Sequence, residues 1–158
     1  MISEIGTWLI FFLPVMGFLA IGLLVRPFLG GQSRVSSLIL IGALSGSFIL
    51  SVWALRCVIQ EGPLIFPGHV WMTLGGLEFE IGLIVDSLTA IMLVVVSGVS
   101  LAIQIYSHGY MKDDPGYVRY YTFMALFSSA MLGLVVASNI IQMFVMWELV
   151  GLGSFLLI

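Results

Sequence analysis

The chain has 158 residues, 61% of them hydrophobic and 8% charged, with a net charge of −3. A soluble domain of this length leaves much of its surface in water, and average soluble domains carry about a quarter charged residues. The composition therefore excludes an ordinary water-soluble fold and predicts an all-α integral membrane protein. The small net charge gives no indication of a nucleic-acid partner. The single cysteine, Cys57, excludes an internal disulfide, and with two distant histidines it makes no zinc site.

Long uncharged stretches predict the membrane-spanning helices, because a helix needs about 20 apolar residues to cross the hydrocarbon core. Residues 5–25, 35–55 and 87–111 are each free of charge and long enough for one span. The first stretch follows an acidic residue, Glu4, and is longer than the apolar part of a signal peptide. We therefore expect it to be a membrane span and not a cleaved leader.

The next uncharged stretch, 120–147, is too long for one simple helix. The small and polar residues at 137–139 interrupt it. We therefore expect a fourth helix over residues 120–137 and a fifth that begins near Asn139 or Ile140. Ser138 or Asn139 is expected to be its N-cap, because both residue types accept a hydrogen bond at a helix start.

The segment between the second and third spans differs from the rest of the chain, because it holds prolines, glycines and three glutamates. Two β-prone runs, His69–Leu74 and Leu77–Ile81, flank Gly75-Gly76, and this pattern predicts a β-hairpin. Bare coil is the alternative. The expected organisation is thus two spans in residues 1–60, a hairpin on one membrane face in 61–85, and spans three to five in 86–158.

The basic residues predict an orientation. With five spans, Arg56 is the one basic residue near the side that carries the N-terminus and the hairpin. The other side carries Arg26, Arg34, Lys112 and Arg119. The positive-inside rule places this second side in the cytoplasm. The N-terminus and the hairpin are then extracytoplasmic, in what we expect to be a bacterial inner membrane.

Glu148 is the one ionisable residue expected near the middle of a span, about 12 Å along the fifth helix. An ionised acid at a helix centre costs about +2.5 to +3.5 kcal/mol on insertion scales. Loss of water disfavours the charge of such a group and a nearby cation favours it. A carboxyl poised between these influences can exchange protons near neutral pH, so Glu148 is the candidate proton-transfer residue. The alternative is a neutral carboxyl that joins helices by hydrogen bonds.

Other polar and small residues have simpler interpretations. Gly151, Gly153 and Ser154 near Glu148, like the pair Gly42 and Gly46, are expected to allow close helix packing. We expect Asp86 to cap the third span. Three further side chains of that span could hold water, although backbone bonds are the simpler expectation for the serines: Ser97, Ser100 and Gln104. His108 could pass protons inward, but an interfacial histidine is the simpler expectation.

The second half of the sequence resembles the N-terminal part of subunit L of NADH:quinone oxidoreductase, which is chain 5 of complex I, in the antiporter-like subunit family. The similarity covers most of residues 70–158 and rests on these segments: Asp86-Ser87-Leu88-Thr89, Tyr110-Met111, Asp114-Pro115-Gly116-Tyr117-Val118-Arg119-Tyr120-Tyr121 and Trp147-Glu148-Leu149-Val150-Gly151-Leu152. Residues 1–60 match the family mainly in the layout of their spans.

The resemblance implies a proton-translocating subunit that couples quinone reduction to proton pumping, with Glu148 as the glutamate of the membrane-arm proton channel. It implies that this glutamate works with lysines on later helices, and that NADH, flavin, iron–sulfur clusters and quinone bind to partner subunits and not to this chain. No metal site is expected. Family chains are several times longer, so we expect this chain to be a fragment that cannot pump alone.

Two other functions remain open at this point. The large subunit of a multisubunit cation/proton antiporter has a similar front end, and the loop 114–117 favours the oxidoreductase. A non-transporting membrane scaffold is the alternative from another class.

Overall fold

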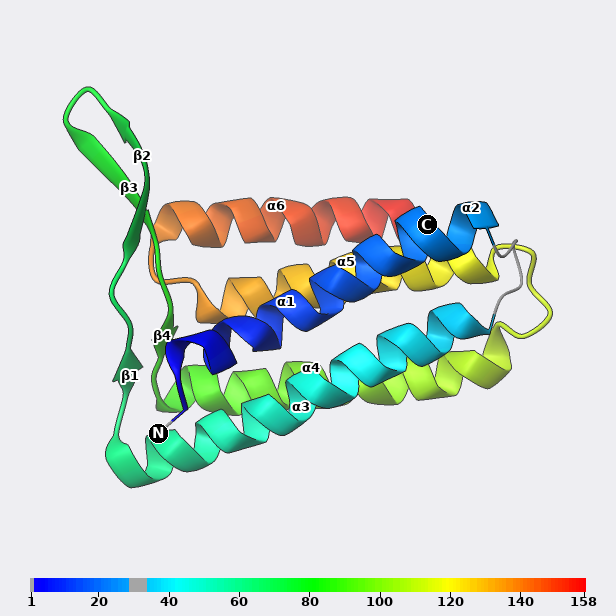
Figure 1. Ribbon diagram of the computed structural model, residues 1–158, viewed down its shortest axis with the longest axis horizontal. Coiled ribbons are helices and arrows are strands. Elements are labelled where there is room, and N and C mark those ends of the chain that lie inside the picture. The colour runs from blue at the N-terminus through cyan, green and yellow to red at the C-terminus, as the bar shows by residue number, and fades with distance from the viewer. Residues whose placement is uncertain (1, 29–33) are drawn as a thin grey trace.

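The computed structural model describes residues 2–28 and 34–158, and within them five helices are long and apolar enough to cross a membrane. Successive spans run in opposite directions, as Figure 1 shows. The first span, Glu4–Phe28, is made of α1 (Glu4–Ala20), the π-helix η1 (Ile21–Val25) and α2 (Arg26–Phe28). The others are α3 (Val35–Glu61), α4 (Ser87–Tyr110), α5 (Tyr117–Val136) and α6 (Ile140–Leu157). The prediction of five membrane helices is confirmed.

The first span changes its helix type without breaking. Pro14 lies inside α1, and the π-helical segment follows it one to two turns later. The Arg26 N–H donates to the carbonyl of Ile21, five residues back, where an α-helix would use the residue four back. The sequence did not indicate this π-helical turn.

Two hydrophobic clusters hold the bundle together, one toward each end. The cluster at the hairpin end includes Ile10, Leu83, Leu93 and Leu132. The cluster at the opposite end is built around Tyr117 and Tyr121 of α5. It also includes Ile21 and Val25 of η1, and Leu40 and Leu44 of α3. α1 packs between α3 and α5, whereas α6 packs on α5 at the edge of the bundle (Figure 1). The only buried residues of α6 within the described chain are Gln142 and Gly153.

The predicted β-hairpin is present between the second and third spans. β2 (His69–Leu74) pairs antiparallel with β3 (Leu77–Ile81), and the register aligns Leu74 with Leu77. Gly75 and Gly76 have φ of 57° and 87°, values that a two-residue hairpin turn requires and that favour glycine. A second antiparallel pair, β1 (Leu64–Ile65) with β4 (Ile84–Val85), closes the base of the hairpin and was not predicted.

The hairpin, the N-terminal end of α1 and the joint between α5 and α6 lie at one end of the bundle, while the α4–α5 connection lies at the other (Figure 1). With five spans, these three parts are expected on the same side of the membrane, and they do lie at the same end of the bundle. Part of the predicted basic loop 26–34 lies outside the described residues.

Candidate functional site

Glu148 is positioned by α6, whose start is fixed by its N-cap. Asn139 accepts a hydrogen bond from the backbone N–H of Gln142 at 2.9 Å, as an N-cap side chain should. Glu148 is the ninth residue of the 18-residue helix that begins at Ile140. At 1.5 Å per residue, its Cα lies about 12 Å along the helix axis. Glu148 is therefore midway along its candidate span.

The Glu148 side chain is exposed on the outer side of α6 in this chain. In the described part of the chain it forms no hydrogen bond or ion pair with another residue. Its neighbours one turn away are exposed as well, among them Phe144 at 55% and Leu152 at 47%. The alternative in which the carboxyl joins helices of this chain by hydrogen bonds therefore has no contact to support it.

The two glycines that follow Glu148 have different surroundings. A Cβ added to Gly153 would lie 3.2 Å from Cβ and 3.3 Å from Cα of Phe127 on α5. Gly153 thus allows the close approach of α5 and α6 that the sequence predicted. Gly151 has open space around it. The pair on α3 divides in the same way, because Gly46 contacts Leu13 whereas Gly42 faces no atom within 4 Å.

The start of α6 is tied to the hairpin through side chains of its first turn. The Asn139 side-chain amide donates to the carbonyl of Glu80 at 2.6 Å, and the buried Gln142 side chain accepts from the backbone N–H of Gly82 at 3.2 Å. A backbone bridge between Leu83 and Ala137 completes the contact. These contacts join segments about 60 positions apart. No local pattern in the sequence indicates that the two segments touch.

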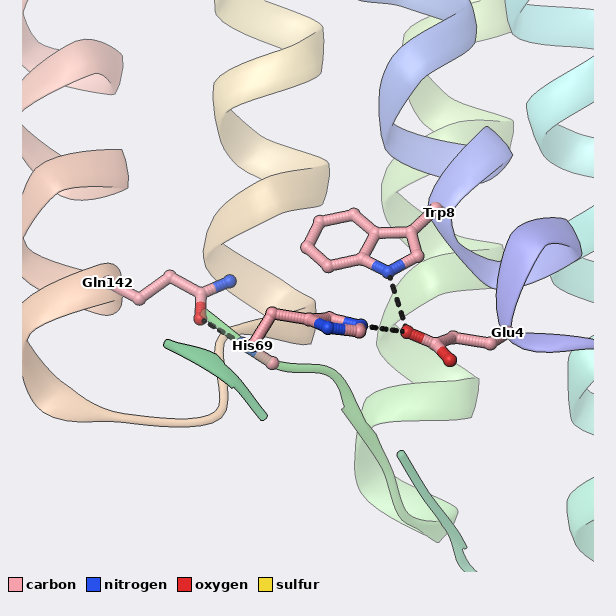
Figure 2. Close-up of polar contacts among 5 residues, drawn as sticks. Glu4, Trp8, His69 and Gln142 are labelled. Carbon is pink, nitrogen blue, oxygen red and sulfur yellow. Dashed lines mark hydrogen bonds and ion pairs between the residues drawn. The ribbon is translucent and has the colours of Figure 1, made fainter. Parts of the chain in front are cut away.

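A second contact ties the hairpin to α1. Glu4 accepts a hydrogen bond from the Trp8 indole at 3.3 Å and contacts His69 of β2 at 2.7 Å, as Figure 2 shows. The His69 side chain is 64% exposed. The hairpin is therefore anchored at two points of the bundle, on α1 and at the α5–α6 joint.

A cleft of about 500 Å³ lies between α1, α6 and the hairpin. Its walls are mainly aromatic and aliphatic, and its charged lining residues are Glu78 and Glu80 of β3. Glu148 is not among its lining residues. The cleft therefore lies toward the hairpin end of the bundle and extends along α6 as far as Met146, two residues before Glu148.

A polar cluster occupies the interior at the opposite end. His108 Nδ1 lies 2.8 Å from the Ser37 hydroxyl and 3.1 Å from the Tyr117 hydroxyl. The Ser107 and Tyr120 hydroxyls lie 2.8 Å apart. His108 is half-buried and joins α3, α4 and α5 at this end of the bundle.

The polar side chains of the third span differ in whether they find a hydrogen-bond partner. Ser97 donates to the carbonyl of Leu93 at 2.6 Å, which is the expected backbone bond. Gln104 is fully buried, and its amide nitrogen and oxygen have no hydrogen-bond partner among the described residues. Of these side chains, Gln104 is the one whose hydrogen-bonding capacity is left open for water.

Asp86 caps α4 as predicted. Its carboxylate accepts a hydrogen bond from the backbone N–H of Thr89 at 2.7 Å. The hydrogen bonds from Thr89 lower the pKa of Asp86 below its usual range. The third span therefore begins at a charged N-cap at neutral pH.

No group of three or more histidine, cysteine or acidic side chains suited to a metal ion occurs in residues 2–28 and 34–158. The arrangement is that of a helical integral membrane unit with a carboxyl group midway along one span and a β-hairpin over one end. Its basic side chains lie toward the span ends. This is the class of protein that the fold and the site define.

Comparison with known proteins shows which proteins the chain is similar to. Residues 71–121 match the family model described as NADH-Ubiquinone oxidoreductase (complex I), chain 5 N-terminus. The chain is 38% identical over 154 residues to NAD(P)H-quinone oxidoreductase chain 5 of Synechocystis sp., covering 96% of this chain and 23% of that protein. It is 40% identical over 148 residues to NADH-quinone oxidoreductase subunit L of Neisseria meningitidis serogroup B, covering 92% and 22%. The resemblance found in the sequence is confirmed: the chain is a relative of the N-terminal part of chain 5, or subunit L.

The chain spans less than a quarter of the length of these relatives. A chain in the solved structure of the membrane-bound sulfane sulfur reductase, an archaeal respiratory membrane complex, has the same fold with a TM-score of 0.80. The sequence identity is 19%, and the match covers 97% of this chain and 30% of that chain. Like the sequence matches over 92% and 96% of this chain, it includes most of residues 1–60, where the resemblance read from the sequence rested mainly on the layout of the spans.

Proposed function

We propose that this chain is the front part of a proton-translocating membrane subunit of NADH:quinone oxidoreductase, and that Glu148 is its proton-transfer residue. The observation that carries the proposal is a lone carboxyl midway along a candidate span, in a chain related to subunit L. The basic residues lie toward the ends of the spans and not near Glu148. An acid at such a depth is costly, so it is typically retained for a function.

The exposed face of α6 that carries Glu148 supports a role in which a group from another helix approaches the carboxyl. Glu148 lies on a helix face where Phe144, Leu152 and Phe155 are exposed. A carboxyl there can change its charge when a cationic group approaches it and when water reaches it. In the proposed mechanism Glu148 takes up a proton while no cation is near, and releases the proton when a cationic partner stabilises the carboxylate. Side chains outside this chain would supply that cation.

The chain itself carries no redox role in this proposal. NADH, flavin, iron–sulfur clusters and quinone would bind to other subunits of the complex, and electron transfer there would drive the proton movement. The complex would lie in a bacterial inner membrane, with the N-terminus and the hairpin on the extracytoplasmic side. The concentration of basic residues at the opposite end supports this orientation.

The test is proton pumping by the assembled complex in membrane vesicles that carry Glu148→Gln. The amide keeps the size and polarity of the side chain but does not titrate, so we expect the pumped proton flux to fall about tenfold or more. Glu78→Gln is the matched control, because it makes the same chemical change at an exposed position of the hairpin. Unchanged pumping in Glu148→Gln, with assembly verified on a native gel, would show that Glu148 does not carry the proton.

A further inference from the structure

A hollow of about 370 Å³ lies at the end of the bundle opposite the hairpin. Its lining residues are Arg26, Pro115, Gly116, Val118 and Arg119. Two of these five side chains are charged, and both are arginines. They come from different spans, since Arg26 begins α2 and Arg119 lies in the first turn of α5.

The packing of the first span against α5 brings the two arginines together. A Cβ added to Gly22 would lie 3.5 Å from Cγ2 of Thr122, so η1 and α5 are in direct contact at this level. Arg26 is four residues after Gly22, and Arg119 is three residues before Thr122. The two helices run antiparallel, so both arginines lie about one turn from the Gly22–Thr122 contact, on the same side of it along the helix axes. Arg26 and Arg119 are therefore at the same height in the bundle.

The two arginines of this hollow form no ion pair within the described residues. The Asp114 carboxylate, on the α4–α5 connection, is held by the Gly116 backbone N–H, from which it accepts at 2.6 Å. The N-cap of α5, Gly116, offers no side-chain acceptor, so the positive end of the α5 dipole adds to the same field. The hollow therefore favours an anion.

The position of the hollow identifies the kind of anion. Both arginines lie in end turns of candidate membrane spans, Glu4–Phe28 and Tyr117–Val136, where a helix meets the lipid headgroups. Beside Arg26 the surface is apolar, because Leu23, Leu24 and Phe28 are 66%, 60% and 79% exposed. A ligand with a phosphate for the arginines and acyl chains for this apolar surface fits both features.

We propose that the hollow formed by Arg26 and Arg119 binds the phosphate group of an anionic phospholipid. Each guanidinium can donate two parallel hydrogen bonds to phosphate oxygens, which gives arginine an advantage over lysine here. Basic hollows between membrane helices are suited to anionic headgroups for this reason. The bound lipid would join α2 to α5, and its single negative charge would reduce the repulsion between the two arginines.

The test is lipid retention. The 158-residue chain is reconstituted in phosphatidylcholine vesicles containing a quarter phosphatidylglycerol, extracted in mild detergent and analysed by native mass spectrometry. We expect about one retained phosphatidylglycerol per chain, and at least a fivefold loss in Arg26→Gln/Arg119→Gln. Arg56→Gln is the matched control, because it removes the same charge from an exposed arginine at the hairpin end. It should retain the lipid as the unmodified chain does.

Three outcomes would overturn the proposal. One is the absence of retained phosphatidylglycerol on the unmodified chain, which needs no variant to fold. Another is an equal loss in Arg56→Gln, which would indicate a general effect of charge. The last is displacement of the lipid by millimolar inorganic phosphate, which would show that the hollow binds a soluble anion. Arg26→Lys/Arg119→Lys keeps the charge and is expected to retain an intermediate amount of lipid.

Discussion

At the scale of single residues, two N-caps show how the same position can be filled by different chemistry. Asp86 begins α4 with a carboxylate, and Asn139 begins α6 with an amide. Both accept from the backbone N–H three residues ahead, Asp86 at 2.7 Å and Asn139 at 2.9 Å. Only the carboxylate titrates, so the strength of the Asp86 cap depends on pH. The Asn139 cap does not depend on pH and serves as an internal reference.

The cap at Asp86 is expected to weaken in acid. The pKa of Asp86 is lowered in the folded chain, so its stabilising effect is complete above the unfolded value of about 4 and is lost as the pH falls through the lowered folded value. The amide protection factor of Thr89 should therefore fall as the pH is lowered below the unfolded value, whereas that of Gln142, which Asn139 caps, should not. Hydrogen exchange in lipid nanodiscs measures both.

The substitution Asp86→Asn serves as the control for this expectation. Asparagine is as good an N-cap as aspartate but does not titrate over this range. Thr89 should then keep its protection at neutral pH and show no fall in acid. A fall of the same size in Asp86→Asn would show that another group controls the start of α4.

At the scale of elements, the hairpin is held where the fourth and fifth spans meet. Asn139 has two roles there, because its side-chain oxygen caps α6 and its side-chain nitrogen donates to the carbonyl of Glu80. Gln142 holds Gly82 from the next turn. A movement of the start of α6 would therefore be transmitted to β3, and the reverse.

The substitution Asn139→Asp separates these two roles. Aspartate caps a helix as asparagine does but cannot donate to the Glu80 carbonyl. One such hydrogen bond contributes about 0.5–1.5 kcal/mol, so amides in residues 78–82 should exchange about two- to tenfold faster. The amides of α6 should keep their protection in Asn139→Asp and lose part of it in Asn139→Ala. Unchanged exchange in residues 78–82 would contradict the anchoring role of this bond.

Much of this element order was predictable from the sequence, and the deviations have physical reasons. Charges gave the number of spans but not their ends, since α3 continues beyond Arg56 to Glu61 and α5 starts at Tyr117, before Arg119. Arginine can remain in a helix and extend its charged group to the interface, so a charge does not end the helix. Gly75-Gly76 predicted the hairpin turn because both positions need positive φ.

The contacts of the candidate site could not be predicted in the same way. The depth of Glu148 follows from counting residues along its helix, but the direction of its side chain depends on which face of α6 packs on α5. That face is set by Gly153 and Phe127, and their contact lies outside any local pattern. The bond between Gln142 and Gly82 joins residues 60 positions apart, and a single polar residue in an apolar stretch does not indicate its partner.

At the scale of the whole molecule, the two ends of the bundle differ both in their structural elements and in their basic residues. The hairpin end carries Arg56, while Arg26, Arg34, Lys112 and Arg119 lie toward the other end. The half-buried polar cluster around His108 and the arginine hollow are also at this second end. If the basic end faces the cytoplasm, these two features face the inner leaflet.

This sidedness can be measured by cysteine labelling of intact cells. In a Cys57→Ser background, which removes the only native cysteine, Glu78→Cys should react with a membrane-impermeant maleimide added outside. Asp113→Cys, on the α4–α5 connection, should react only after the membrane is opened. Both positions are exposed, so access to the reagent depends on the membrane and not on burial. External labelling of Asp113→Cys would reverse the orientation.

The π-helical turn in the first span also fixes the direction in which the following turn faces. It accommodates one more residue between Ile21 and Arg26 than an α-helical turn would. Removing one residue from this turn would rotate Arg26 by roughly 100° about the helix axis, relative to Gly22 and its contact on α5. The π-helical turn therefore sets the direction in which the last turn of the span faces, and Arg26 lines the same hollow as Arg119.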